Sequence, residues 1–191
     1  MKIPLTVWQI ELIPWYVFVA YWAISWLRVK RTKTAESLNS RLATILPMVL
    51  VFELLFSNAL RVGPLRLRFL PVEDWIVWSG IALTSLGVAL AIWARYSIGQ
   101  YWSARVTLKE GHRVIRSGPY AWVRHPIYTG ILTGLLGTAM VEGQVRGIFA
   151  FLVTLAGFWV KLGIEEQMMR KAFGAEYEEY ARRTGALVPR I

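Results

Sequence analysis

The sequence predicts an all-α integral membrane protein with five transmembrane helices, the last two of which form a helical hairpin. Three observations support this. Hydrophobic residues make up 55% of the 191 residues and charged residues only 18%, too few polar groups to cover a soluble domain of this size. Apolar runs close to the length that spans ~30 Å of hydrocarbon recur along the chain. Basic residues gather in the loops after alternate runs.

Five apolar runs are candidate membrane spans. The first covers residues 7–27; it has a single basic residue ahead of it and no small-residue cleavage pattern after it, which predicts a retained span. The second and third cover residues 42–60 and 75–94. The fourth, residues 126–141, is short and rich in glycine, and a brief turn separates it from the fifth, residues 147–164. So short a connection predicts an antiparallel hairpin.

The basic residues predict the orientation of these spans. In an alternating arrangement, all but five of the 22 Lys and Arg residues fall on one side of the membrane. The five on the other side are Lys2, Arg61, Arg66, Arg68 and Arg146. Basic loops are usually cytoplasmic, so we expect the N-terminus outside and the C-terminus in the cytoplasm. Two places remain open for Arg61, Arg66 and Arg68: the outer headgroup level, or a shallow hairpin of the second and third spans.

Charge and composition also exclude several classes of function. The net charge of +10 is spread over loops beside the spans, without an RNA-binding motif, so lipid headgroups account for it and no nucleic-acid partner is expected. The chain has no cysteine, which excludes disulfides, thiolate nucleophiles and Cys-ligated zinc. Its two histidines, His112 and His125, are too few for a histidine-rich metal site.

The segment between the third and fourth spans, residues 95–125, carries more rings and cations than a connector needs. Gly118 and Pro119 predict a turn, and Pro126 suits the first position of a helix with His125 at its N-cap. Free N–H groups and the positive end of the helix dipole favour an anion there. Two interpretations stay open: an interfacial loop anchored by aromatic and arginine side chains, or a ligand site.

Charged residues at the end of the fifth span form a second candidate cluster. Lys161 and Glu165 are four residues apart and share a helix face, and Glu166 follows directly. Ionisable groups near the membrane are costly, which favours a functional role. The alternative is that Lys161 snorkels to the interface and Glu165 begins the solvated part of the helix.

An amphipathic helix is predicted after the fifth span. Met169, Phe173, Tyr177 and Tyr180 form an apolar stripe at helical spacing, suited to packing against the loop or the membrane surface. Two pairs of opposite charge have i,i+4 spacing: Glu178 with Arg182, and Glu179 with Arg183.

Two acids and two glycines lie within the spans. Glu11 is close enough to the end of the first span to reach water, so Glu53 in the second span is the better candidate for a group that faces a polar cavity and binds substrate. Gly130 and Gly134 in the fourth span predict close packing against a neighbouring helix.

Several motifs occur in a specific order. GPY, RHP and IYTG follow one another between His112 and Gly130, and then come the pair Glu165 and Glu166, FGAEYEEY and a terminal VP. Together they resemble the isoprenylcysteine carboxyl methyltransferase family and its bacterial and archaeal relatives, which are in turn similar to phospholipid N-methyltransferases. The resemblance covers about half of the chain. It divides the chain into an N-terminal three-span region, residues 1–94, and a catalytic core, residues 95–191.

The resemblance implies a helical membrane enzyme that binds S-adenosylmethionine without a Rossmann domain, in agreement with the lack of a Gly-x-Gly-x-x-Gly element. It implies catalytic roles for Glu165 and Lys161. Lys161 stands where eukaryotic members have an arginine beside the lipid substrate; it keeps the charge but loses the bidentate fork that suits a carboxylate. The implied cofactor contacts are His112, Arg113, Val114, Ile115, Tyr120, His125, Pro126, Ile127, Tyr128 and Glu165.

We therefore expect methyl transfer from S-adenosylmethionine to a lipid-like or prenylated acceptor within the bilayer. Carboxylate O-methylation is the first hypothesis and phospholipid N-methylation the second, with Lys161 and Glu53 as substrate-binding residues. An NADPH-dependent membrane reductase is the alternative, because sterol reductases resemble the same helical core, although they carry additional spans. A non-enzymatic membrane scaffold is a third interpretation. The sequence leaves the acceptor and the oligomeric state open.

Overall fold

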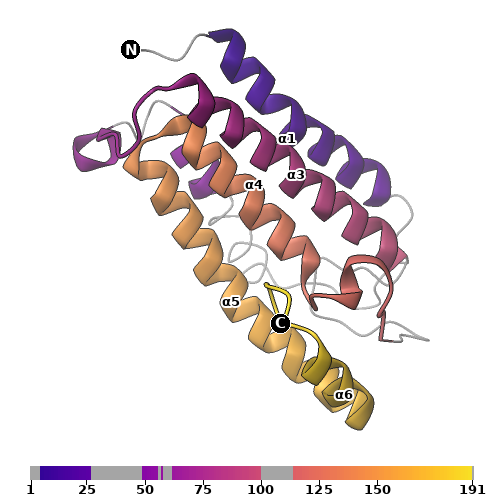
Figure 1. Cartoon of the computed structure of the whole chain (residues 1–191). Coiled ribbons are helices and arrows are strands. Elements are labelled where there is room, and N and C mark those ends of the chain that lie inside the picture. Colours follow the sequence, from indigo (N-terminus) through magenta and orange to yellow (C-terminus); the bar gives the residue numbers. More distant parts are fainter. Residues whose placement is uncertain (1–4, 27–48, 56, 58–61, 100–113, 191) are drawn as a thin grey trace.

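A computed structural model describes residues 5–26, 49–55, 57, 62–99 and 114–190, which form a bundle of long helices (Figure 1). Residues 49–55 are helical as well. Within these ranges no sheet forms; two isolated bridges join Arg68 to Gln144 and Val123 to Gly185. The predicted all-α class is therefore confirmed. The elements are α1 (Leu5–Trp26), η1 (Gly63–Arg66), α3 (Asp74–Ile98), η3 (Gly118–Ala121), α4 (Pro126–Glu142), α5 (Val145–Phe173) and α6 (Ala175–Arg183).

Three helices in the described part of the chain are long and apolar enough to cross a membrane: Thr6–Ser25 in α1, Asp74–Ile98 in α3 and Val145–Phe173 in α5. The fourth predicted span is α4, which is apolar but has only 17 residues. The second predicted span lies partly outside the described residues. Large apolar side chains are exposed along α1 and α5, the reverse of a soluble surface. The chain is thus an all-helical membrane protein.

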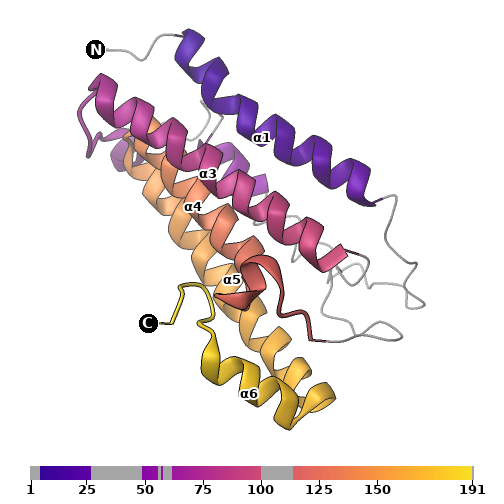
Figure 2. The same ribbon diagram turned by 45° about the vertical axis from the view of Figure 1, so that its right-hand side comes forward.

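The long helices pack in the order α1, α3, α4, α5, with α3 between α1 and α4 (Figures 1 and 2). α1 and α3 run in the same direction, because Glu11 contacts Thr84 near their beginnings and Ser25 contacts Arg95 near their ends. The chain between them therefore has to return along the bundle.

Residues 49–55 lie on this returning path. Leu54 and Leu55 are almost completely buried and pack against Leu135 of α4 and Ala150 of α5. This short helix thus contributes to the core between the hairpin helices.

α3 and α4 bring their backbones into contact through glycines. A Cβ added to Gly130 would lie 2.6 Å from the amide nitrogen of Ala91 and from the carbonyl oxygen of Gly87. A Cβ added to Gly134 would lie 3.1 Å from the ring of Trp15 in α1. The predicted packing role of both glycines is confirmed, and this close approach fixes the start of α4 relative to α3.

A buried polar cluster joins α1 to α3 and α4. Glu11 is fully buried, and its Oε1 accepts hydrogen bonds from Thr84 Oγ1 at 2.9 Å and Thr138 Oγ1 at 2.6 Å. Trp15 Nε1 also donates to Thr138 Oγ1, at 2.9 Å. The expectation that Glu11 reaches water was wrong. The two threonines supply hydrogen bonds to Oε1 inside the bundle, which offset part of the cost of burying a carboxyl group.

α4 and α5 form the predicted hairpin. Gly143 ends α4 in the left-handed conformation, with a φ of +63°, and α5 begins two residues later. Arg146 and Glu142 form a buried ion pair, with 2.5 Å between Nη2 and Oε1. Arg68 Nη1 donates to the carbonyl oxygen of Glu142 at 3.0 Å, so this arginine packs on the hairpin turn. Arg61 lies outside the described residues.

The glycine contact predicts a position-specific loss of stability. Gly130→Ala should lower the free energy of unfolding by about 1–3 kcal/mol, because the added methyl group forces α3 and α4 apart. Gly157→Ala is the matched control, since Gly157 of α5 has open space around its Cα. Thermal unfolding in detergent measures both variants, and equal melting temperatures would contradict the tight α3–α4 contact.

Candidate functional site

The two charged segments that the sequence singles out meet at one end of the bundle. η3 leads into α4, with His125 at its N-cap and Pro126 as its first residue, as predicted. α5 has 29 residues against 17 in α4, so its C-terminal part extends past the start of α4. Glu165 and Glu166 lie on this part of α5, beside His125.

His125, Tyr128, Glu165 and Glu166 form the centre of the cluster. Tyr128 Oη donates to Glu165 Oε1 at 2.7 Å. Nδ1 of His125 lies 3.4 Å from Glu165 Oε2, and its Nε2 lies 3.5 Å from Glu166 Oε1. The His125 and Tyr128 rings are stacked, with an interplanar angle of 4° and 5.5 Å between centroids. Three predicted site residues from two helices are therefore brought together.

Arg124 is a site residue that the sequence interpretation missed. Its Nε donates to Glu166 Oε1 at 2.7 Å, and both side chains are about nine-tenths buried. Nη2 of Arg170 lies 3.2 Å from Glu166 Oε2. These guanidinium groups compensate the buried carboxylate. A signal existed in the sequence, since each residue adjoins a predicted site residue: Arg124 precedes His125, and Glu166 follows Glu165.

Lys161 and Phe158 of α5 contact the ring of Tyr128. Lys161 Nζ lies 5.6 Å from the ring centroid, a distance at which an aromatic face attracts a cation. The Phe158 ring stacks on Tyr128 with 4.4 Å between centroids and an angle of 21°. Lys161 and Glu165 thus both contact Tyr128, as expected for residues on one helix face.

The other predicted cofactor contacts that the structure describes lie in η3, just before it and at the start of α4. Tyr120 is buried in η3, where its carbonyl oxygen accepts a hydrogen bond from Tyr180 Oη at 2.7 Å. Burial raises the pKa of the Tyr120 phenol, which therefore stays neutral. Val114 packs in an apolar cluster with Tyr177 and Tyr180. Pro126 is buried and Ile115 and Ile127 are half-buried, whereas His112 and Arg113 lie outside the described residues.

α6 folds back onto the end of α5. Gly174, with a φ of +51°, ends α5 and starts α6. The predicted apolar stripe packs on Val114, and the predicted pair of Glu179 and Arg183 forms at 2.6 Å. Glu178 instead contacts Arg170 of α5, with 2.9 Å between Oε1 and Nε, and so ties the two helices together.

Glu53 lies apart from these residues in the described structure. It is half-buried in the helix of residues 49–55, whose leucines pack nearer the hairpin turn than the start of α4. In the described part of the chain, no hydrogen bond or ion pair joins the Glu53 side chain to the cluster. Its assignment as a substrate-binding residue stays a prediction.

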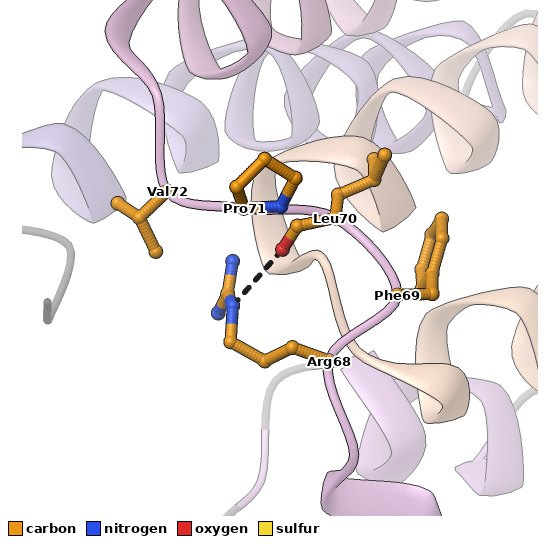
Figure 3. A pocket seen from close by; sticks show the side chains of 5 residues that line it. All are labelled: Arg68, Phe69, Leu70, Pro71 and Val72. Carbon is orange, nitrogen blue, oxygen red and sulfur yellow. Dashed lines mark hydrogen bonds between the residues drawn. The ribbon is translucent and has the colours of Figure 1, made fainter.

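A surface hollow at the other end of the bundle is lined by Arg68, Phe69, Leu70, Pro71 and Val72 (Figure 3). Arg68 Nε donates to the carbonyl oxygen of Leu70 at 3.2 Å along its wall. The 17 residues of α4, about 25 Å at 1.5 Å each, separate it from His125. The hollow therefore takes no part in the candidate site.

The surroundings of His125 favour its charged form. Burial lowers the pKa of its imidazole, but the carboxylates of Glu165 and Glu166 outweigh burial and raise the pKa above the ordinary value of 6.5. Geometry supports the same state, because carboxylate oxygens face both ring nitrogens and only an imidazolium carries a proton on each.

This arrangement is suited to binding and positioning. Carboxylates can accept hydrogen bonds from ammonium or hydroxyl groups, aromatic faces can contact a cation, and Lys161 can attract an anion. Among the described residues, no group of three or more His, Asp or Glu side chains could hold a metal ion.

The model of one protein family matches the part of the chain that contains this cluster. The model, described as phospholipid methyltransferase, matches residues 75–176, just over half of the chain. The chain belongs to the phospholipid methyltransferase family. Its predicted resemblance to methyltransferases of the isoprenylcysteine type is confirmed, and the match also includes α3, which the motifs do not reach.

Three curated relatives of this phospholipid methyltransferase family member illustrate two kinds of name. A probable protein-S-isoprenylcysteine O-methyltransferase of Oryza sativa subsp. indica is 31% identical over 123 residues, 62% of this chain and 64% of the relative. The protein-S-isoprenylcysteine O-methyltransferase of Schizosaccharomyces pombe is 32% identical, over 59% and 49%. The cobalt-zinc-cadmium resistance protein CzcN of Cupriavidus metallidurans is 34% identical, over 61% and 52%. The chain thus spans less than two thirds of these relatives, none of which is named a reductase.

A solved structure shares the fold of this family member. The structure of the eukaryotic intramembrane Ras methyltransferase, an isoprenylcysteine carboxyl methyltransferase, aligns with a TM-score of 0.58 over 94% of this chain and 67% of that chain. Sequence identity is 21%, so the match establishes the common helical membrane fold.

The raised pKa of His125 predicts how stability depends on pH. The imidazolium stabilises the fold fully below the unfolded pKa near 6.5, and this contribution is lost as the pH rises through the higher folded pKa. The melting temperature in detergent should therefore fall as the pH rises above 6.5, and His125→Gln should reduce this fall. An equal pH dependence in both proteins would contradict the charged His125.

Proposed function

We propose that this protein is a membrane methyltransferase that transfers a methyl group from S-adenosylmethionine to a lipophilic acceptor. The observation that carries the proposal is the contact of His125 and Tyr128 with Glu165, which joins the RHP segment to the end of α5. The names of the isoprenylcysteine methyltransferase relatives support the same reaction class.

The donor set of the cluster fits S-adenosylmethionine. Glu165 can accept hydrogen bonds from ribose hydroxyls or the ammonium group, and the faces of Tyr120 and Tyr128 suit a sulfonium. When bound, the cofactor supplies an activated methyl group that is displaced in line, so positioning and water exclusion are the protein's tasks. The remaining proposed contacts are His112, Arg113, Val114, Ile115, His125, Pro126 and Ile127.

The acceptor in this proposal enters from the lipid side of α5. Trp159, Val160 and Ile164 are more than half exposed and flank Lys161 on the helix. A hydrocarbon chain can lie against these side chains while Lys161 attracts an anionic group next to Tyr128. The cation of Lys161 beside Tyr128 favours a carboxylate acceptor and O-methylation over N-methylation of an amine headgroup.

We further propose five spans, with the N-terminus outside and the C-terminus in the cytoplasm. The parallel course of α1 and α3 supports an additional crossing between them. Because the chain lacks cysteine, a single introduced cysteine reports which side of the membrane its position faces, with no labelling of native cysteines.

Membrane-impermeant thiol reagents test this topology. Ser117→Cys should react only from the cytoplasmic face and Leu67→Cys only from the outer face, since both residues are exposed at opposite ends of the bundle. Labelling of both variants from the same face would contradict the proposed orientation.

Cofactor binding tests the proposed function directly. Isothermal titration of purified protein with S-adenosylmethionine should show saturable binding, which Glu165→Gln weakens at least about tenfold because a hydrogen bond to a charged group is lost. Glu179→Gln is the matched control, since Glu179 pairs with Arg183 on α6. Binding of NADPH in place of S-adenosylmethionine would favour the reductase, and binding of neither would contradict the proposal.

A further inference from the structure

The segment that follows α6 lies against the start of α4. Residues 184–187, which we name the tail, run beside residues 122–125. The amide of Arg124 donates to the carbonyl oxygen of Gly185 at 2.8 Å, and that of His125 to Ala186 at 3.0 Å. Of the N–H groups at the start of α4, where the sequence predicts that an anion is favoured, the amide of the N-cap residue His125 is therefore bonded to the tail.

Side chains reinforce this contact. Thr129 Oγ1 donates to the carbonyl oxygen of Leu187 at 2.7 Å. Thr184 Oγ1 donates to the carbonyl oxygen of Tyr180 at 2.7 Å and anchors the beginning of the tail to α6. The tail is thus fixed both to α4 and to α6.

The Arg124 guanidinium connects the tail to the candidate site. Nη1 donates to the carbonyl oxygens of Ala181 and Thr184, while Nε donates to Glu166 Oε1 at 2.7 Å. The planar fork of an arginine can hold such acceptors in fixed directions, which a lysine cannot do. One side chain therefore links α6, the tail and α5.

Contacts from the tail reach His125 by two routes. The carbonyl oxygen of Ala186 accepts a hydrogen bond from the backbone amide of His125. Arg124 binds Glu166, and Oε1 of Glu166 lies 3.5 Å from Nε2 of His125. Backbone and ring are thus both constrained from the side of the tail.

We propose that Arg124 is a positioning residue through which the tail fixes His125 and Glu166 in the geometry that binds the cofactor. The proposal rests on the proposed function for the identity of that ligand. Arg124 acts through its neighbours, so its loss changes the placement of His125 even in the ligand-free protein.

Gly185 allows the tail to be displaced without altering Arg124. A Cβ at this position would collide with the carbonyl oxygen of Val188. Gly185→Ala therefore forces the backbones of Gly185 and Val188 apart and disturbs the tail, and Arg124→Gln removes the link from the other side. If the tail acts through Arg124, the two changes are not independent.

The test combines cofactor affinity with a spectroscopic signature of His125. The chain has only two histidines, so ring signals of isotope-labelled histidine are few, and His125→Gln identifies the signal of His125. Titration with S-adenosylmethionine gives the affinity of each variant. Arg116→Gln is the matched control, because Arg116 binds Glu176 of α6 at 3.2 Å and does not contact Glu166 in the described structure.

We expect Arg124→Gln to weaken binding of S-adenosylmethionine by about tenfold, as for the loss of a hydrogen bond to a charged group. The double variant Arg124→Gln with Gly185→Ala should bind no more weakly than whichever single variant binds less tightly. Arg124→Lys should give no rescue, because it lacks the fork. The His125 signal should move in Arg124→Gln and Gly185→Ala, and stay in place in Arg116→Gln. Melting temperatures establish that each variant is folded during the measurement.

Three outcomes would each overturn the proposal. The losses of affinity in Arg124→Gln and Gly185→Ala could multiply in the double variant, Arg124→Lys could restore full affinity, or the His125 signal could stay unchanged in Arg124→Gln and Gly185→Ala. If the wild-type protein binds no S-adenosylmethionine, the proposed function fails, and the His125 signal alone decides the positioning role: it supports that role if it moves in both variants and refutes it if it stays.

Discussion

Two adjacent carboxylates on one membrane helix impose the constraint on which the rest of this site depends. Glu165 and Glu166 lie at the end of α5, one largely and one almost entirely covered by protein. A buried carboxylate is tolerated only with cations and hydrogen-bond donors around it. Tyr128, His125, Arg124 and Arg170 meet this requirement, and the start of α4 has to lie beside α5 for the first three to do so.

The bundle holds the start of α4 in that place. Glycine contacts let α3 and α4 approach at backbone distance, so α4 has little freedom to slide or tilt. Arg146 and Glu142 close the hairpin at its other end, and α1 is attached through Glu11. A short α4 and a long α5 then leave the two glutamates beside the RHP segment.

The predictable features are those with a local physical signature. Proline at a helix start, a short turn between two apolar runs and a four-residue spacing predicted the beginning of α4, the hairpin and the shared face of Lys161 and Glu165. The burial of Glu11 depends on Thr84 and Thr138, more than 70 residues away in sequence, and local hydropathy contains no such information. The position of Arg124 next to His125 was a local signal, but its partners on α5 and α6 are distant in sequence and could not be predicted.

Methyl transfer itself is the most direct test of this account. Purified protein in vesicles would be incubated with methyl-labelled S-adenosylmethionine and either membrane lipid extract from the source organism or a synthetic prenylcysteine. The account predicts label in the lipophilic fraction, released as methanol by mild base because the product is a methyl ester, and its loss in Glu165→Gln. Base-stable label would indicate N-methylation, and no labelled lipophilic product from either acceptor would contradict the account.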